Sequence, residues 1–412
     1  MIKLTIFSLY SFTIFYDLKL YFDFLTFANL SLGLIGLTCL IKKEILSFFF
    51  INDEDKRRSN FLLYSFFFVF LLSIIDIIHQ IPLRGIIISL VTKICILFLL
   101  PYSYYLYLKL KFNFLNYFNS ILLVHSVFIF FQIFGYEINI SNLIPKNLFI
   151  TAWSTDIQIN YDLKRLSGAV SSPIFLSYQL LFIFAYNLVN YFYHKKKRNF
   201  LFVILTIIIL FLAQSRAAVA ILLPSTFLSY MFFVNFRLKI LSNFLIFIFI
   251  FISIYIFMTP FLESNLPYLT KSITLSDTHR TYTNYYISIG ILKESPLIGI
   301  NPYEAWNLFE KYSDPNYANI YSRLEETPTH HNQFFFYLRY YGLVGLILLI
   351  FLIFKIFKLI RISDNFENRY LVGMILILDI AYSLTHNNKL ISPLIWMFLS
   401  FVFIQKDNYV KN

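Results

Sequence analysis

The amino-acid sequence predicts an all-α polytopic membrane protein with about twelve transmembrane helices. Of its 412 residues, 58% are hydrophobic and only 14% are charged, whereas soluble domains carry about 25% charged residues. The apolar residues also lie in blocks of 15 to 23, interrupted by short basic clusters. A bilayer core about 30 Å thick needs roughly 20 apolar residues per helix. These observations exclude a soluble globular protein.

The apolar blocks give the positions of the helices. The predicted spans are 4–16, 21–41, 61–78, 86–108, 114–134, 173–193, 200–213, 217–234, 240–261, 334–354, 370–385 and 389–405. The first block lacks a small-residue cleavage site, so we expect a first helix rather than a signal peptide. Cys39 and Cys95 both fall inside spans, and their positions fit neither a disulfide framework nor a metal site.

The basic residues predict the orientation of the spans. Clusters fall on one side of the predicted topology at 42–43, 56–58, 109–111, 195–198, 237–239 and 355–361. The short loops on the other side hold only Lys19, Arg84, Arg216 and Lys389. The positive-inside rule therefore places both termini in the cytoplasm. It also accounts for the net charge of +12 without a nucleic-acid partner.

The spans divide the chain into three parts. Residues 1–261 form a transmembrane bundle that includes an outer segment, 135–172. Residues 262–333 form a large outer loop, and 334–412 form the C-terminal helices. Loops longer than about 15 residues are often functional, and the large loop holds three of the seven histidines, His279, His330 and His331. We therefore expect the chemistry there.

A histidine pair precedes a glycine pair where the large loop re-enters the membrane. His330-His331-Asn332 is followed by Gly342 and Gly345. A histidine with an ordinary pKa near 6.5 can accept a proton at neutral pH; the alternative is that it only caps the helix. Two glycines three residues apart would give a helix a flat face for close packing.

Three arginines could bind an anionic substrate. Arg216 lies between two spans, Arg280 lies early in the large loop, and Arg165 precedes Ser167-Gly168. The guanidinium fork suits bidentate phosphate recognition. The alternatives are an Arg216 that extends to the lipid headgroups and solvated loop charges for the other two. Two of these arginines on one face would suit a diphosphate.

Four charged residues, Asp76, Lys93, Arg339 and Asp379, lie within or near spans. A charge at the middle of a membrane helix costs roughly 2.5–3.5 kcal/mol, so we expect all four to face the bundle interior. His125, on an apolar span, is expected to be a hydrogen-bonded core residue.

Together these residues resemble the O-antigen ligase and polymerase superfamily of bacterial envelope glycosyltransferases. Its signature is a histidine, then Asn, Ser or Gln, nine residues and G-x-x-G. This sequence has His331-Asn332, nine residues, and Gly342 to Gly345. Similar segments are 214–218, 165–168 with Pro173, and 279–306 with its P-x-x-G turn at 296–299. One departure is Tyr340, where the family often has an acidic residue.

The resemblance implies a GT-C-like bundle in the bacterial inner membrane with a periplasmic active site. The implied reaction is a metal-independent, inverting transfer from an undecaprenyl-diphosphate-linked glycan that needs no cofactor. His331 would be the base, and Arg216, Arg280 and Arg165 would hold the diphosphate. His330, Asn332, Gly342 and Gly345 would support them.

The acceptor stays open. The favoured acceptor is lipid A-core, as in an O-antigen ligase, and the alternative is a second lipid-linked repeat, as in a polymerase. A protein hydroxyl is a third choice. A flippase for lipid-linked glycan fits the number of spans, but the lack of internal repeats and the long outer loop rich in His, Arg, Trp and Tyr favour an enzyme.

Overall fold

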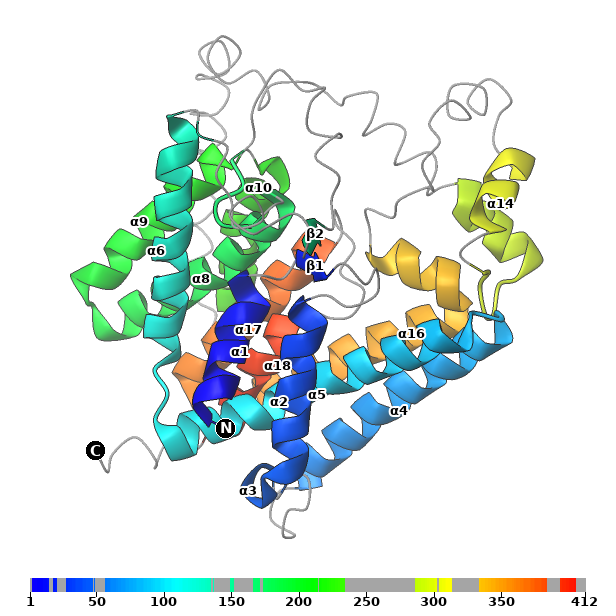
Figure 1. Ribbon diagram of the computed structural model, residues 1–412, viewed down its shortest axis with the longest axis horizontal. Helices are drawn as coiled ribbons and strands as arrows, with labels where there is room; N and C mark the ends of the chain where they lie inside the picture. The colour runs from blue at the N-terminus through cyan, green and yellow to red at the C-terminus, as the bar shows by residue number, and fades with distance from the viewer. Residues whose placement is uncertain are drawn as a thin grey trace.

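The computed structural model describes residues 2–14, 18–20, 27–46, 48, 56–134, 136, 149–151, 166–170, 173–213, 215–233, 286–301, 304–312, 333–383 and 393–404. These ranges are almost entirely helical (Figure 1). The helices are α1 (Ile2–Ile14), α2 (Phe27–Ile41), α3 (Lys43–Leu46), α4 (Lys56–Ile78), α5 (Leu83–Leu110), α6 (Phe114–Ile133), α8 (Pro173–His194), α9 (Lys197–Leu212), α10 (Arg216–Phe233), α14 (Ala305–Tyr312), α16 (Gln333–Arg361), α17 (Phe366–Ser383), α18 (Pro393–Leu399) and the 3-10 helix η4 (Ser400–Phe403). Residues 286–294 are also helical.

Two short strands add to the predicted all-α fold. β1 (Leu18–Leu20) and β2 (Phe149–Thr151) pair antiparallel, with Lys19 opposite Ile150. The pair ties the segment after α1 to residues in the predicted outer segment, 135–172.

A helix lies at eleven of the twelve predicted spans; the remaining span, 240–261, falls outside the described residues. Five helices in the described part of the chain are long and apolar enough to cross a membrane: Asn60–Ile78, Leu83–Leu110, Phe114–Ile133, Ile174–His194 and Gln333–Arg361. The chain is therefore a multi-helix membrane protein, and the number twelve stays a prediction. The helix α16 continues beyond its predicted span, through the basic residues after 354 to Arg361. Basic side chains are favourable in the last turn of a helix.

Tight turns join neighbouring helices. Three non-glycine residues adopt a positive φ, at Gln80 (55°), Lys111 (49°) and Lys195 (54°). Each lies in a connection of two to four residues between helices, α4–α5, α5–α6 and α8–α9. The Lys111 N–H bonds back to the Leu106 carbonyl, and the Asn113 side chain caps α6 by accepting from the Asn116 N–H at 3.0 Å. The first and third of these turns fold α5 back against α4 and α9 back against α8.

The short helix α18 lies inside the bundle and packs against α5 and α17 (Figure 1). Trp396 is fully buried and its ring lies 5.8 Å from that of Phe61 on α4. Phe398 stacks on Phe118 of α6 at 5.1 Å and on Phe182 of α8 at 6.0 Å. Aromatic pairs of this kind add about 0.5–1.5 kcal/mol each beyond their buried area. One helix too short to span a bilayer thus packs against several longer ones.

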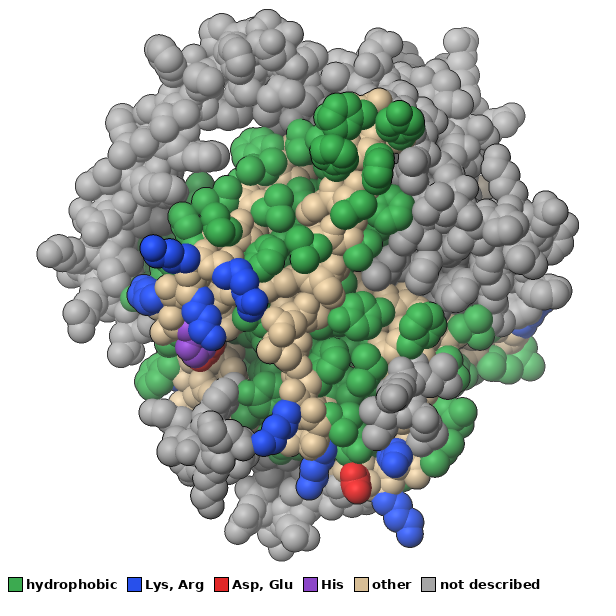
Figure 2. Space-filling view, turned by 60° about the vertical axis from the view of Figure 1, so that its left-hand side comes forward, with side chains coloured by type: hydrophobic (Ala, Val, Ile, Leu, Met, Phe, Trp, Pro, Cys, Tyr) green, Lys and Arg blue, Asp and Glu red, His purple; other side chains and the backbone are tan. Residues whose placement is uncertain are grey.

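The outer helices present apolar side chains to their surroundings. On α6, Leu123, Val127 and Phe130 are 50–57% exposed, while Leu122 and Ile129 on the other face are buried. Figure 2 shows the same property over a whole side of the molecule, where hydrophobic side chains cover most of the described surface. An apolar stripe of this size suits lipid rather than water.

The described basic loops gather at one end of the bundle. Phe48, after α3, packs on Phe403 of η4 at 5.8 Å, and Phe114 at the start of α6 packs on Phe401 at 5.3 Å. Arg198 donates to the Asn116 side chain at 3.4 Å. The clusters at 42–43, 109–111 and 195–198 therefore share one side, as predicted, and Figure 2 shows Lys and Arg side chains mainly along the left and lower parts of the described surface.

Labelling of single cysteines tests the orientation. Cys39 and Cys95 are buried, so they should not react with a membrane-impermeant maleimide. We expect Lys196→Cys to react only in permeabilised spheroplasts and Glu294→Cys to react in intact ones. The reverse pattern would contradict a cytoplasmic location for the basic end.

Candidate active site

The candidate active site lies where α16 begins, at the end opposite the basic loops. Three segments far apart in the sequence meet there: the α4–α5 turn, residues 296–301, and a break in α16 at Gly342. We call this meeting point the glycine junction. Figure 1 shows α16 as a short first part and a long second part that meet at an angle beside the α4–α5 turn.

The break in α16 exchanges helical hydrogen bonds for bonds to a turn. Gly342 has φ 60° and ψ −158°, which is far from helical geometry. In an unbroken helix the Leu343 N–H would bond to the Arg339 carbonyl. Here the Leu343 N–H bonds to the Pro296 carbonyl at 2.8 Å, and the Arg339 carbonyl accepts the Ile300 N–H at 2.8 Å. The Val344 N–H bonds to the Leu297 carbonyl at 3.1 Å, so these buried backbone groups are paired.

Only glycine fits at the two points of closest approach. Gly299 has φ 74°, and a Cβ there would lie 2.7 Å from the Gly342 nitrogen and also against the Arg339 carbonyl. A Cβ on Gly342 would lie 2.5 Å from the Gly299 nitrogen and against Leu297. The P-x-x-G turn and the first glycine of G-x-x-G therefore contact each other directly.

This contact corrects the expectation of a flat helical face. Gly342 is not helical, and it packs against a backbone turn rather than a second helix. A Cβ on Gly345 would collide with the Tyr341 side chain one turn earlier, so Gly345 makes room for that ring. The motif thus builds a break and not a helix–helix contact.

His79 fixes the third segment of the junction. Its Nε2 lies 2.9 Å from the Ile298 carbonyl, and because a carbonyl can only accept, Nε2 carries the proton and donates. The Asn301 amide donates to the His79 carbonyl at 2.8 Å. The turn at 296–301 is therefore held by side chains from both directions.

A small separate core supports the turn. Ile287, Ile291, Leu308 and Phe309 are buried together between helix 286–294 and α14. Lys311 donates to Glu294 at 2.5 Å. This hydrogen bond lowers the pKa of the Glu294 carboxyl and raises the pKa of Lys311.

The segment after Arg165 is held by α6. The Gln132 side chain accepts from the Ser167 and Gly168 N–H groups at 3.1 and 3.0 Å and donates to the Gly168 carbonyl at 2.9 Å. His125 accepts from the Ala169 N–H through Nδ1 at 3.2 Å, so its Nε2 donates to the Gln179 side chain at 2.8 Å. His125 is fully buried with both ring nitrogens bonded, which confirms it as a core residue.

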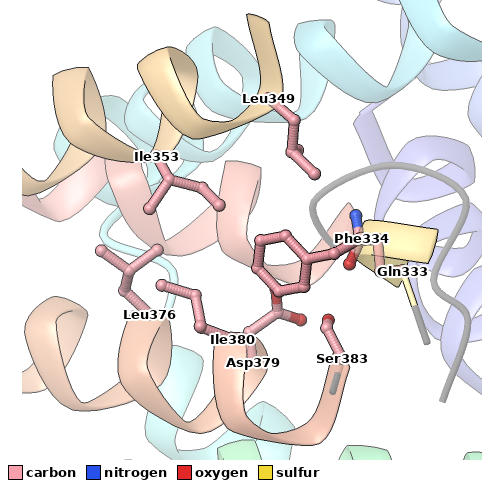
Figure 3. Close-up of a pocket in the computed structure, with 8 residues that line it drawn as sticks. All are labelled: Gln333, Phe334, Leu349, Ile353, Leu376, Asp379, Ile380 and Ser383. Atoms are coloured by element: carbon pink, nitrogen blue, oxygen red, sulfur yellow. The ribbon is translucent and has the colours of Figure 1, made fainter. Parts of the chain in front are cut away.

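A small cavity lies between the first residue of α16 and α17 (Figure 3). Gln333 and Ser383 are 3% and 2% exposed, and among the described residues the Gln333 Nε2 and Ser383 Oγ have no hydrogen-bond partner. Asp379 also lines the cavity and accepts from the Tyr178 hydroxyl at 2.7 Å. The space open to the centre of a water molecule is about 10 Å³, close to what one water needs. Gln333 directly follows His331-Asn332 in the chain.

The buried charges face the interior as predicted. Asp76, Lys93, Arg339 and Asp379 are 5%, 9%, 2% and 2% exposed. Among the described residues, no group of three His, Cys, Asp or Glu side chains could hold a metal ion.

Most of the predicted site residues lie outside the described part of the chain. These are His330, His331, Asn332, Arg280 and Arg165. Arg216 is the first residue of α10, with only its backbone described. The convergence of His331 with Arg216 and Arg280 therefore stays a prediction, whereas Gly342 and Gly345 are placed.

Residues 201–350 match the family model described as O-Antigen ligase. This region is similar to the O-antigen ligase family. It includes most of α9, all of α10, the turn at 296–301 and the break at Gly342, together with Arg216, Arg280 and His331, which confirms the resemblance drawn from the motif. No curated protein matches the chain.

Alanine substitutions test the junction of the O-antigen ligase region. In Gly342→Ala and Gly299→Ala the added methyl group meets backbone that cannot move without losing hydrogen bonds, so we expect a loss of about 3 kcal/mol or more. The matched control is Gly33→Ala in α2, where nothing lies within 4 Å of the new Cβ; it should be neutral or stabilising by up to about 1 kcal/mol. Thermal unfolding in detergent measures both. Equal stability of Gly342→Ala and Gly33→Ala would refute the junction.

A pair of glutamines tests the polar cavity. Gln333→Met removes a buried amide whose Nε2 has no partner in the described part of the chain. A buried polar group without a partner costs about 1–3 kcal/mol, so the variant should be at least as stable as the wild type. Gln179→Met removes an amide bonded to His125 and to the Thr13 carbonyl and should lower stability by a similar amount. Thermal unfolding in detergent compares the stabilities of the two variants. A Gln333→Met variant that is less stable than Gln179→Met would contradict this account of the Gln333 amide.

Proposed function

We propose that this protein transfers an O-antigen or related glycan from undecaprenyl diphosphate to an acceptor hydroxyl at the periplasmic face of the bacterial inner membrane. The observation that carries the proposal is the His331-Asn332 pair at the family's spacing from Gly342 and Gly345, inside the O-antigen ligase region. The described apolar helices supply the membrane setting that a polyprenyl-linked donor needs.

In the proposed reaction His331 removes the proton of the acceptor hydroxyl. The oxygen attacks the anomeric carbon, the bond between that carbon and the diphosphate oxygen breaks, and the electron pair leaves on the diphosphate. Arg216 and Arg280, with Arg165, stabilise the charge that develops there. A single displacement inverts the anomeric carbon, and a diphosphate leaves readily enough for one base and a cationic site to suffice.

Two features of the described residues support this assignment of roles. Arg216 begins α10, and the first turn of a helix presents N–H groups and a partial positive charge to anions. The glycine junction fixes the short first part of α16, and residue 331 precedes this part by two positions. In this proposal the diphosphate binds at the start of α10, and the base lies next to the start of α16, which the glycine junction holds in place.

The acceptor decides between two versions of the proposal. We favour lipid A-core, which makes the protein an O-antigen ligase; a second lipid-linked repeat would make it a polymerase. A lipopolysaccharide gel of a deletion strain separates them. Bare core with accumulated lipid-linked polymer supports the ligase, and core carrying a single repeat unit supports the polymerase.

His331→Ala tests the enzymatic role. Loss of a general base lowers rates by about 10²–10⁴-fold, so we expect surface polysaccharide to fall below detection at normal protein levels. The control is His194→Ala, which removes an exposed histidine at the basic end that bonds Glu367 at 3.0 Å and should leave transfer unchanged. Normal polysaccharide in His331→Ala would favour a flippase over a transferase.

A further inference from the structure

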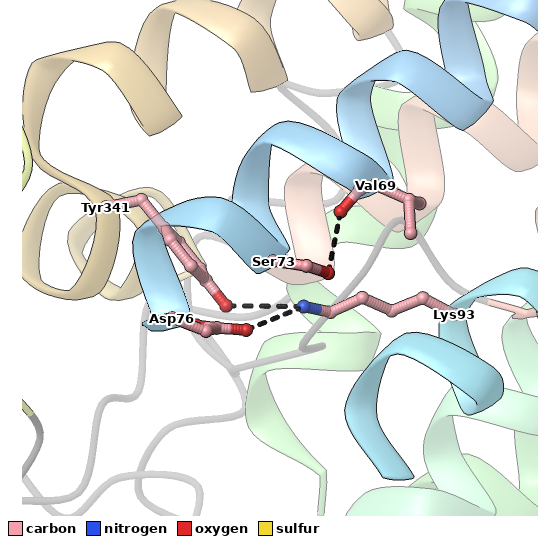
Figure 4. Close-up of polar contacts among 5 residues, drawn as sticks. All are labelled: Val69, Ser73, Asp76, Lys93 and Tyr341. Carbon is pink, nitrogen blue, oxygen red and sulfur yellow. Dashed lines mark hydrogen bonds and ion pairs between the residues drawn. The ribbon is translucent and has the colours of Figure 1, made fainter. Parts of the chain in front are cut away.

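A buried ion pair joins α4 and α5 close to the break in α16. The Lys93 ammonium lies 3.4 Å from the Asp76 carboxylate, and both residues are at least nine-tenths buried within spanning helices. Figure 4 shows the two side chains reaching toward each other from neighbouring helices. The hydroxyl of Ser73, on the same turn of α4, instead bonds to its own helix at the Val69 carbonyl.

Tyr341 brings α16 into this pair. Its hydroxyl accepts from the Lys93 ammonium at 3.5 Å, and that ammonium lies 5.6 Å from the centre of the ring. Tyr341 is 6% exposed and immediately precedes Gly342. One turn earlier, Tyr337 is fully buried and stacks on Phe68 of α4 at 6.1 Å. The last turn before the break therefore contacts α4 and α5 through its side chains.

The contact lies beside the break, where a small change of angle would displace the start of α16. The first part of α16 runs from Gln333 to Tyr341, about 14 Å at 1.5 Å per residue. A tilt of about 10° at the break would move its start by about 2 Å over that length. Misplacing a catalytic group by about 1 Å can lower a rate about 10²-fold. A side-chain restraint beside Gly342 thus controls where the chain leaves α16 toward residue 331.

We propose that Asp76, Lys93 and Tyr341 form a positioning site that fixes the angle of the first part of α16 and so places His331 for proton removal. This rests on the proposed function, in which His331 is the base. Burying two charges in a membrane is costly, and an apolar pair can often replace a buried ion pair without loss of stability. Hydrogen bonds depend on direction, in contrast, so the bonds within this group favour one relative orientation of the three helices. None of the three residues contacts substrate in this proposal.

The kinetic test compares four variants. Asp76→Asn with Lys93→Met removes both charges at similar volume, and Tyr341→Phe removes only the hydroxyl. We expect kcat for glycan transfer in proteoliposomes to fall at least tenfold in the double variant and about threefold in Tyr341→Phe, with KM for the lipid-linked donor within twofold. Lys93→Arg keeps the charge and should restore most of the rate. His194→Ala, which breaks the exposed pair with Glu367 at the basic end, is the control and should match the wild type.

A distance measurement tests the angle without using activity. Nitroxide labels at Phe335 and Phe354, which are 37% and 59% exposed on the two parts of α16, report the bend by pulsed electron paramagnetic resonance. The distance distribution should shift or broaden in the double variant and stay unchanged in His194→Ala.

The outcomes separate the two hypotheses. An unchanged distance in the double variant overturns the positioning site, as does a changed distance with a wild-type kcat. A KM that rises while kcat is kept also overturns it. If His331→Ala transfers glycan at the wild-type rate, the proposed function fails, and the distance measurement still decides whether the three residues hold the bend.

Discussion

The organisation of the outer end depends on one exchange of backbone hydrogen bonds. At Gly342 the helix gives up bonds that it would make to itself, and residues 296–300 take their place. Inside a membrane a backbone group without a partner costs several kcal/mol. The break can therefore exist only while the turn is docked. This requirement couples a segment of the large loop to the helix that follows it, and it makes two glycines 43 positions apart one structural unit.

A buried ion pair and a partly buried histidine lie beside that unit. His79 bonds the turn, and Asp76 and Lys93 meet Tyr341 next to the break. Most of the remaining interior is apolar and aromatic. Removing one partner of a buried ion pair typically costs about 3–5 kcal/mol, whereas replacing both is often neutral. An ion pair of this kind beside the break suggests selection for geometry there, while α18 and its aromatic neighbours pack the rest of the interior.

Much of the fold could be predicted because the membrane imposes a length and a composition on each span. Helices lie at eleven predicted positions, and basic loops at 42–43, 109–111 and 195–198 share one end. The burial of Asp76, Lys93, Arg339 and Asp379 followed from the cost of charge in lipid. The glycine motif also led to the correct family region. The roles of His331 and the three arginines remain inferences from that motif.

The sequence by itself determined the class of protein, the positions of its helices and the family that its central region resembles, because these depend on local hydropathy, charge and spacing. Only the tertiary structure decided what Gly342 does, that Gly299 is its partner, and that Tyr341 reaches Lys93. Those facts depend on backbone dihedral angles and on contacts between residues more than 40 or 200 positions apart. The spacing of residues in the sequence gives neither the dihedral angles nor these contacts, since the same G-x-x-G spacing is compatible with a straight packed helix and with a broken one.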